Sequence, residues 1–469
     1  MKNPTRLLVL LAVCAFTLAV MPLIALAQEK DSAPEKDAKA SPAVEPAPET
    51  PTIIAPPKPT PPAYSVKPVA VSGVSTLGSL VDAKLQVELS PYGASIHTIK
   101  TADYRRTVEG KDPYTVLSAL EVRNDLGNLE VWERPFSANA IIINGIHRVD
   151  LWQHKWELVA PGQYRIQILD DAGKATLEIT RTYSLGTGDG GYDLTCNTSL
   201  KNLSDKPLTA VWEQNAHGDL ERDSSYQGDT RSILVGYHNL DYDESRVDVY
   251  TDKTNFVRIK AIDEYAEAGT TIWPRENTPK PNELLWIAMS NRYFSTVLHR
   301  PIPVKPQDKE GRVVGQPMEQ ILEPKIGMRV GGQLIGKIDT RVLMLTVTSK
   351  PIELAPGATG QFDLCLYAGP RLKTILNGEP YSTLKLGAHL VRYEMGCSMC
   401  LFQGLANFLL GFLTLIHAIV FDWGFAIIIL VLVVRLLLHP ITKKAQINMT
   451  RMSKQMATLQ PELAKLKER

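Results

Sequence analysis

The chain has 469 residues, enough for more than one domain, and its charge is almost balanced, with 51 Lys and Arg against 50 Asp and Glu. A net charge of +1 gives no electrostatic indication of a nucleic-acid partner. The five cysteines are too few for a disulfide-held domain, because Cys14 lies in an apolar leader and only four others remain.

Residues 1–27 have the features of an export signal. Lys2 and Arg6 precede a long uncharged run, and Ala-Leu-Ala at 25–27 resembles a signal-peptidase site. The run of about 20 residues is longer than the core of a typical signal, so an uncleaved transmembrane anchor is an equal alternative to a signal peptide. In both cases the basic residues stay inside and the chain that follows is exported.

Residues 28–68 form a segment rich in Pro, Ala, Glu, Lys and Thr, with five prolines between residues 56 and 62. This composition cannot bury a core, and it predicts a disordered or extended linker that separates a domain from the membrane.

Residues 69–385 contain short runs of alternating apolar and polar residues, separated by Gly, Pro, Asn and Asp. This pattern is typical of strands, and it predicts one large all-β sandwich. No dinucleotide-binding, P-loop or H-E-x-x-H motif is present. Representative predicted strands are 84–89, 140–146, 164–169, 176–183, 246–250, 341–348 and 361–367.

Residues 386–422 approach the membrane and include an uncharged run at 401–420. Its polar or small residues form one helical stripe, which fits an interfacial helix as well as a membrane span. Only three residues separate this run from the next, too few for a hairpin of two spanning helices, so we predict an amphipathic helix on the outer surface. The stripe consists of Gln403, Asn407, Gly411, Thr414 and His417.

Residues 423–440 are predicted to be a transmembrane helix, because the run is apolar except for one arginine and is close to the minimum spanning length. Arg435 lies about 18 Å along the helix from Trp423, within the hydrocarbon layer. An arginine there costs about 2.5–3.5 kcal/mol on insertion scales. Either Arg435 snorkels toward Lys443 and Lys444, or it faces a polar cavity inside the membrane, and the second interpretation is preferred.

Residues 441–469 carry seven basic and two acidic residues. An apolar seam at steps of four and three predicts a basic helix that packs against a partner helix. The alternative is a helix lying on anionic lipid. The regularity of the seam favours a partner that would follow residue 469, and therefore an incomplete sequence. The seam comprises Ile441, Ala445, Met449, Met452, Met456, Leu459, Leu463 and Leu466.

Two other groups of residues suggest chemistry. His217, with Glu213 or Asp219, fits acid–base catalysis in a membrane-tethered carbohydrate-active or carbohydrate-binding β-sandwich, although a lone histidine is more often structural. Cys397 and Cys400 form one C-x-x-C, which fits a redox site, half of a metal site or a plain disulfide. A structural disulfide or no role is preferred, because zinc needs four ligands.

The C-terminal third carries a family resemblance. Asp422-Trp423-Gly424-Phe425, Val434-Arg435, His439-Pro440-Ile441-Thr442-Lys443-Lys444 and Leu459-Gln460-Pro461-Glu462 occur in the same order in bacterial YidC-type membrane protein insertases of the Oxa family, which the chain therefore resembles. In the exported part, segments at 88–96, 179–183, 200–204, 286–294 and 366–370 are also similar to this family.

The resemblance implies a periplasmic β-supersandwich, similar to sugar mutarotases but without catalysis, followed by the α-helical membrane region. Arg435 would line a hydrophilic groove that receives substrate segments, and the helix from Ile441 would be the first arm of a cytoplasmic hairpin. Family members continue with further transmembrane helices, so the resemblance also implies a C-terminally truncated chain of partial or no activity.

The resemblance therefore implies the function of an insertase and chaperone. The protein would be a multi-pass protein of the bacterial inner membrane, with its large domain in the periplasm. Insertion of this kind requires no covalent chemistry, cofactor or metal, so the chain is not expected to be an enzyme. The implied partners are nascent membrane proteins and lipids, with the Sec translocon and the ribosome as further candidates, and no nucleic acid.

Overall fold

The computed structural model describes most of residues 64–391 and residues 403–467. The predicted leader, residues 28–63 of the predicted linker, and Cys397 and Cys400 lie outside the described residues. Within the described part, the gaps are 108, 124–128, 188–190, 219, 222–230, 241–246, 253–269, 275–277, 279, 303–314, 332–333, 336–337 and 340–341.

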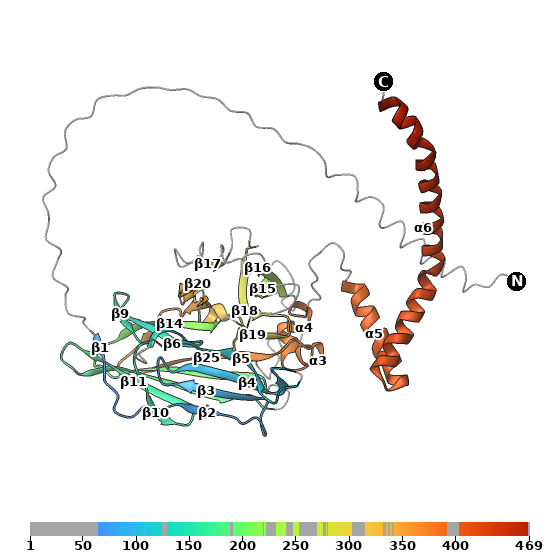
Figure 1. Cartoon of the computed structure of the whole chain (residues 1–469). Helices are drawn as coiled ribbons and strands as arrows, with labels where there is room; N and C mark the ends of the chain where they lie inside the picture. The colour runs from blue at the N-terminus through green and yellow to red at the C-terminus, as the bar shows by residue number, and fades with distance from the viewer. Residues whose placement is uncertain are drawn as a thin grey trace, which may run out of the picture. The chain divides into compact units, whose positions relative to one another are not determined.

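Residues 64–391 contain a large antiparallel sheet that joins strands from both ends of this part of the chain (Figure 1). Its pairing of β12 with β13 runs without a register shift from Leu177↔Asn202 to Leu185↔Leu194. The sheet order is β1 (Tyr64–Val66), β11 (Gln163–Asp170), β12 (Ala175–Leu185), β13 (Asp193–Asn202), β25 (Thr359–Pro370), β19 (Phe294–His299), β18 (Asn282–Ser290), β15 (Ser232–Asn239) and β16 (Val247–Asp252), with β10 (Glu157–Ala160) also on β11.

Two further sheets complete the β domain. The first has the order β17 (Thr270–Trp273), β20 (Ile326–Gly331), β23 (Val342–Thr348), β14 (Leu208–Gly218), β8 (Ala138–Ile143) and β9 (His147–Asp150), with β24 (Ile352–Leu354) on β14. The second is β2 (Ser75–Leu77), β3 (Leu85–Ser90), β4 (Ser95–Arg105) and β5 (Pro113–Ser118). Two-stranded ribbons are β6 (Leu120–Arg123) with β7 (Leu129–Glu133), and β21 (Leu334–Ile335) with β22 (Ile338–Asp339).

One apolar core lies between these sheets. Trp212 on β14 is fully buried, and its ring centroid is 6.5 Å from that of Phe362 on β25 and 6.5 Å from that of Trp156. Large aromatic side chains at such edge-to-face distances join the faces of two sheets with a large buried apolar area. The predicted all-β sandwich is therefore confirmed.

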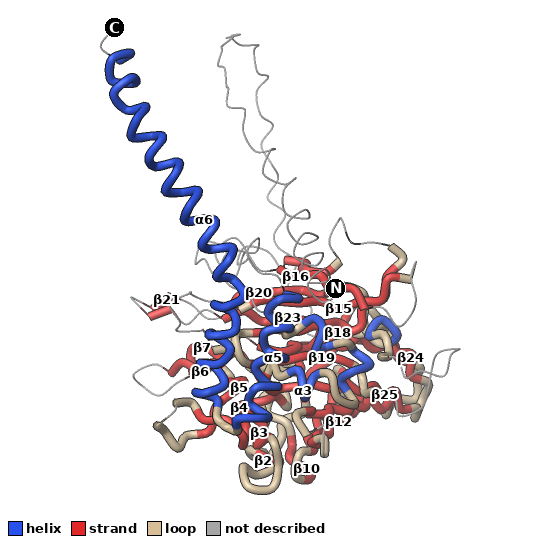
Figure 2. Tube along the Cα trace, turned by 90° about the vertical axis from the view of Figure 1, so that its right-hand side faces the viewer, coloured by secondary structure: helices blue, strands red, loops and turns tan. Residues whose placement is uncertain are grey.

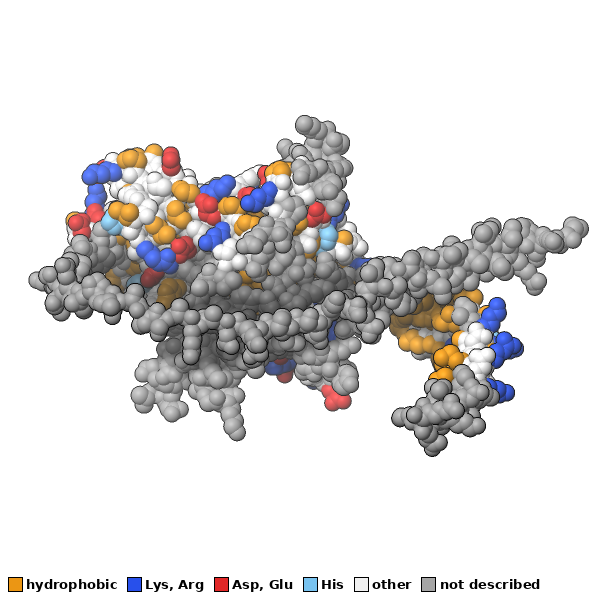
Figure 3. All heavy atoms as spheres, turned by 90° about the horizontal axis from the view of Figure 1, so that it is seen from above, with side chains coloured by type: hydrophobic (Ala, Val, Ile, Leu, Met, Phe, Trp, Pro, Cys, Tyr) orange, Lys and Arg blue, Asp and Glu red, His pale blue; other side chains and the backbone are white. Residues whose placement is uncertain are grey.

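Each of the seven predicted strands coincides with an observed strand. The run at 140–146 differs at its end, because β8 stops at Ile143 and the chain turns through Asn144 and Gly145, with φ of 53° and 74°. An Asn-Gly pair adopts these positive φ values readily, and it produces the tight hairpin between β8 and β9. On the face visible in Figure 3, acidic and basic side chains are interspersed over the β domain.

The β domain ends in the short helices α3 (Lys373–Leu376), η3 (Tyr381–Leu384) and α4 (Leu386–His389), and another short helix, η2 (Met318–Gln320), lies between β19 and β20. The indole Nε1–H of Trp286 donates to the Leu384 carbonyl at 3.0 Å, which fixes η3 to β18. Val391 is 8% exposed and β1 pairs with β11 before residue 69. We therefore propose 64–391 as the limits of the folded domain, slightly wider than the predicted 69–385.

Two helices follow, α5 (Gln403–Val420) and α6 (Trp423–Lys467). Figure 2 shows α6 as one long helix, which continues through Pro440. Among the described residues, one stretch, Trp423–Pro440, is long and apolar enough to cross a membrane by length and composition. It coincides with the predicted transmembrane segment, and the basic segment from residue 441 is its direct helical continuation.

Candidate functional site

The turn between α5 and α6 is defined by three local interactions. Phe421 has a φ of 59°, in the left-handed region that reverses the chain. The Asp422 carboxylate accepts a hydrogen bond from the Phe425 N–H at 2.9 Å, which makes Asp422 the N-cap of α6. The His417 ring stacks on Trp423, with centroids 3.7 Å apart and an interplanar angle of 11°. These interactions fold α5 back against the first part of α6.

The contact between the two helices uses one face of each. Ile416 of α5 is 7% exposed and Ala426 of α6 is fully buried. Further along α6, Leu430, Val433 and Val434 are partly buried and continue the Ala426 face. A small side chain at Ala426 allows the two helices to approach closely where the turn brings them together.

Arg435 lies on the opposite face of α6. It follows Ala426 by nine residues, which is two and a half helical turns, so its side chain points away from α5. It is exposed, and its neighbours on this face, Ile428 at 61% and Leu432 at 56%, are exposed as well. Over the described residues, no hydrogen bond or ion pair to Arg435 is present. The face thus presents one cation within an apolar surface that α5 leaves uncovered.

The second half of α6 is polar and charged. Lys443, Lys444, Arg451 and Lys454 are exposed, as are the seam residues Met449, Met452 and Met456, at 74%, 66% and 57%. The helix therefore changes from apolar to basic shortly after Pro440. A change of this kind is typical of a helix that leaves the membrane on its cytoplasmic side.

His217 lies in β14 and is fully buried. Its Nε2 is 3.3 Å from the Ile287 carbonyl oxygen, and desolvation lowers the pKa of the imidazole to about 4. Glu213 forms an ion pair with Arg148 at 2.5 Å, and Asp219 lies outside the described residues. A histidine without access to solvent cannot exchange protons with a sugar, so the structure does not favour the carbohydrate-active alternative.

The cysteines in the described part are also structural. Cys196 and Cys365 are free and buried, and desolvation raises the pKa of the Cys365 thiol to about 12. A thiol of this kind is unreactive because the thiolate is the nucleophile. Among the described residues, no group of three or more His, Cys, Asp or Glu side chains has an arrangement that could hold a metal ion.

A second arginine in apolar surroundings, Arg181 on β12, was not singled out from the sequence. It is fully buried, and its guanidinium donates to the carbonyls of Ala94 at 3.1 Å and Phe136 at 2.5 Å, and to Gln214 Oε1 at 3.3 Å. Its Cζ also lies 5.6 Å from the Trp212 ring. The alternation of β12, in which Ile179 and Tyr183 point inward, was a signal that Arg181 points inward too.

The fold thus defines a large β-sandwich domain joined to a helical hairpin with one potential membrane span. The family model of the YidC periplasmic domain matches residues 79–388, more than half of the chain. The chain therefore belongs to the YidC family, as the sequence resemblance predicted.

One relative and two solved structures are similar to parts of this chain. The membrane protein insertase YidC of Bordetella petrii is 27% identical over 306 residues, which cover 65% of this chain and 44% of the relative. The chain thus matches less than half of the length of this relative. A galactose mutarotase related enzyme from Lactobacillus acidophilus has a TM-score of 0.36 at 14% identity, covering 63% of this chain and 97% of that one. A putative aldose 1-epimerase from Escherichia coli K12 has a TM-score of 0.32 at 12% identity, covering 64% and 99%.

Proposed function

We propose that this chain is part of a membrane protein insertase that acts in the bacterial inner membrane. Three observations support the proposal: membership of the YidC family, the relative described as an insertase, and an apolar helix of spanning length that follows the β domain and α5. The β domain would lie in the periplasm. If residues 1–27 are retained as an anchor, the chain crosses the membrane twice.

The charges around α6 support one orientation. Trp423 fits the periplasmic boundary, and Lys443 with Lys444 fits the cytoplasmic boundary, where positive residues are preferred. Helix α5 ends at the periplasmic boundary, and its stripe of polar and small residues supports an interfacial position for it. With α6 as the span, the basic half of α6 enters the cytoplasm and could form the first arm of a substrate-guiding hairpin.

Arg435 would be the residue that binds incoming segments. In the low dielectric of the bilayer, a charge without a partner strongly attracts an acidic or polar group that is itself poorly accommodated by lipid. The apolar face around Arg435 suits the hydrophobic part of the same segment. Insertion by this route needs no covalent step, and its clients would be nascent membrane proteins, which the chain would also help to fold. The Sec translocon and the ribosome are candidate partners for their delivery.

The observation that carries this proposal is an exposed arginine without a partner in the described part of an apolar helix of a YidC-family chain. The test is an insertion assay with a chain that carries the further C-terminal helices implied by the family. Arg435→Ala should lower insertion about tenfold or more, since it removes the charge that would attract the acidic or polar groups of the incoming segment. Arg435→Lys should retain part of the activity.

The matched control is Arg106→Ala, which removes the same charge from the exposed surface of the β domain, where Arg106 pairs with Glu221. It should leave insertion close to the wild-type level. Normal insertion by Arg435→Ala, together with loss of activity on deletion of the β domain, would contradict the proposal and would support a tethered docking scaffold instead.

A further inference from the structure

The last part of the β domain forms a rigid corner with the loop after β18. We define the terminal corner as Asn291, Arg292, Tyr293, Arg371 and Leu372. The Arg371 N–H donates to the Tyr293 carbonyl at 2.7 Å, and the Arg371 guanidinium donates to the carbonyls of Asn291 and Leu390. The Asn291 side chain in turn accepts the N–H groups of Tyr293 and Phe294 at 3.1 Å and 2.8 Å. The corner thus has its conformation fixed by hydrogen bonds from three segments.

This corner presents apolar and basic side chains together. Tyr293 is 65% exposed and Leu372 is 44% exposed. The Arg292 guanidinium lies 5.9 Å from the Tyr293 ring, and Lys373 follows Leu372 at the start of α3. Over residues 371–391 the basic residues are Arg371, Lys373 and Lys385, against a single acidic residue, Glu379. Exposed Tyr and Leu beside Arg and Lys are the residue types found at the boundary between lipid and water.

The chain itself keeps this corner close to the membrane. Val391 is buried in the β domain and α5 begins at Gln403, so eleven residues, 392–402, connect them. Twelve Cα–Cα steps span at most about 40 Å. With α6 in the bilayer and α5 at its surface, the segment from α3 to Val391 is the part of the described β domain nearest to the lipid along the chain, and Arg371 of the corner donates to its Leu390 carbonyl. The basic excess there complements anionic headgroups.

We propose that the terminal corner is a docking surface for the anionic lipid headgroups of the membrane that holds α6. Tyr293 and Leu372 would enter the headgroup layer, while the basic side chains would contact phosphate groups. Docking would hold the β domain in a defined orientation above the hairpin. The inference depends on the membrane position proposed for α6, but it does not depend on insertase activity.

The test uses the full chain in vesicles of phosphatidylcholine with or without phosphatidylglycerol. The photo-crosslinking residue benzoylphenylalanine replaces Tyr293, and crosslinked lipid is measured by mass spectrometry. The comparison position is Ile146, which is 78% exposed in the turn between β8 and β9, at the end of the β domain away from α3 and α4 (Figure 1). Phe425, 63% exposed on α6, serves as the position that reports membrane insertion.

We expect lipid crosslinks at positions 293 and 425 and few at 146. The yield at 293 should fall about fivefold or more without phosphatidylglycerol or at about 0.5 M salt, which screens surface charges. The double variant Arg292→Ser, Lys373→Ser should lower it as well. Lys174→Ser, which removes a charge from a remote, exposed ion pair, should not.

Three results would overturn the inference. Equal yields at 293 and 146 would show that the corner is not in contact with lipid. Crosslinks from 293 to protein would show that the corner binds another polypeptide. Absence of lipid crosslinks at 425 as well would show that α6 is outside the membrane, and the proposed function would then fail together with the docking surface.

Discussion

Two arginines in apolar surroundings differ in how their charge is stabilised, one in the β domain and the other in the hairpin of α5 and α6. In the β domain, Arg181 is fully buried and donates hydrogen bonds to Ala94, Phe136 and Gln214, which come from distant parts of the chain. On α6, Arg435 is exposed and has no such partner among the described residues. The first charge is stabilised by the fold. The second has no partner in the described residues, and in the proposed function it is stabilised by the segments that bind to it.

The same contrast extends to the other polar groups. In the β domain, side chains bond to residues far away in sequence, as when Arg181 contacts Phe136. In the described part of the hairpin, several side-chain hydrogen bonds are local: Thr414 donates to the Leu410 carbonyl, Thr442 to the Leu438 carbonyl, and the Asp422 carboxylate accepts from the Phe425 N–H. Hydrogen bonds between residues that are distant in sequence help to hold the fold of a domain together. A helix with only local hydrogen bonds depends for its stability on packing or on the membrane around it.

The largest expected effect concerns Arg181. Arg181→Met leaves buried carbonyls and Gln214 without their donor, and should lower the free energy of unfolding by about 3–5 kcal/mol. Denaturant unfolding of the β domain measures this. Arg106→Met is the matched control, because Arg106 is an exposed partner of Glu221 and its removal should cost less than about 1 kcal/mol. Equal losses of unfolding free energy for Arg181→Met and Arg106→Met would show that the fold does not depend on the Arg181 charge, and the contrast with Arg435 would then fail.

His217 gives the next effect, as a dependence of stability on pH. Its pKa falls from 6.5 in the unfolded chain to about 4 in the folded domain, so the unfolded state binds more protons between these values. Stability is therefore complete above pH 6.5 and decreases as the pH falls toward 4, by about 3 kcal/mol in total.

Denaturant unfolding at several pH values tests this decrease. His217→Gln should flatten the curve between pH 6.5 and 4, whereas His97→Gln, at a partly exposed position, should leave the decrease in place. A curve that keeps its slope without His217 would show that this residue is not the buried group that is protonated on unfolding.

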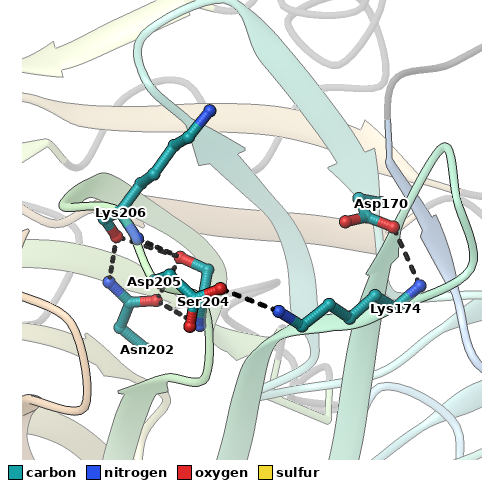
Figure 4. A network of polar contacts seen from close by, with 6 residues as sticks. All are labelled: Asp170, Lys174, Asn202, Ser204, Asp205 and Lys206. Carbon is teal, nitrogen blue, oxygen red and sulfur yellow. Dashed lines mark hydrogen bonds and ion pairs between the residues drawn. The ribbon is translucent and has the colours of Figure 1, made fainter.

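Asn202 tests the network drawn in Figure 4. The Asn202 amide donates to the carbonyls of Lys206 at 2.7 Å and Leu354 at 2.9 Å, while its oxygen accepts the Ser204 N–H at 2.8 Å. Asn202→Ala should cost about 1–3 kcal/mol in unfolding free energy, because the buried Leu354 carbonyl loses a donor. Lys174→Ala breaks the exposed pair with Asp205 and should change stability by less than about 1 kcal/mol. If Asn202→Ala and Lys174→Ala both left the unfolding free energy unchanged, the role given to distant hydrogen bonds in the β domain would be weakened.

The smallest expected effect lies in the hairpin, at the cap of α6. Asp422→Ala removes the acceptor for the Phe425 N–H and should destabilise the first turn by about 1 kcal/mol, a roughly fivefold faster amide exchange at Phe425. Hydrogen exchange of the chain in detergent or vesicles measures it. Asp422→Asn keeps the acceptor and should exchange at nearly the wild-type rate. No change in Asp422→Ala would indicate that the His417–Trp423 stack alone holds the turn.

Much of this architecture could be predicted from local patterns. Alternation with a period of two predicted the strands, because one face of each strand is buried, and an apolar run of sufficient length predicted α6. The left-handed conformation of Asn144 and Gly145 ends β8 earlier than its apolar run suggests, since turn chemistry prevailed over hydrophobicity there. Arg435 could be singled out as a candidate from the sequence because a charge in an apolar run is conspicuous without any knowledge of the fold.

What the sequence determined by itself is therefore the order of the parts: a β-rich domain, a short amphipathic run, an apolar helix with one arginine and a basic continuation. Only the tertiary structure decided which polar residues are enclosed. His217 became a buried core residue and Arg181 a buried cation, because strands distant in sequence close over them. The tertiary structure also placed Arg435 on the face of α6 away from α5. Burial depends on which elements pack together. Residues in such contacts are far apart in the chain, so no local sequence pattern predicts that they will be buried.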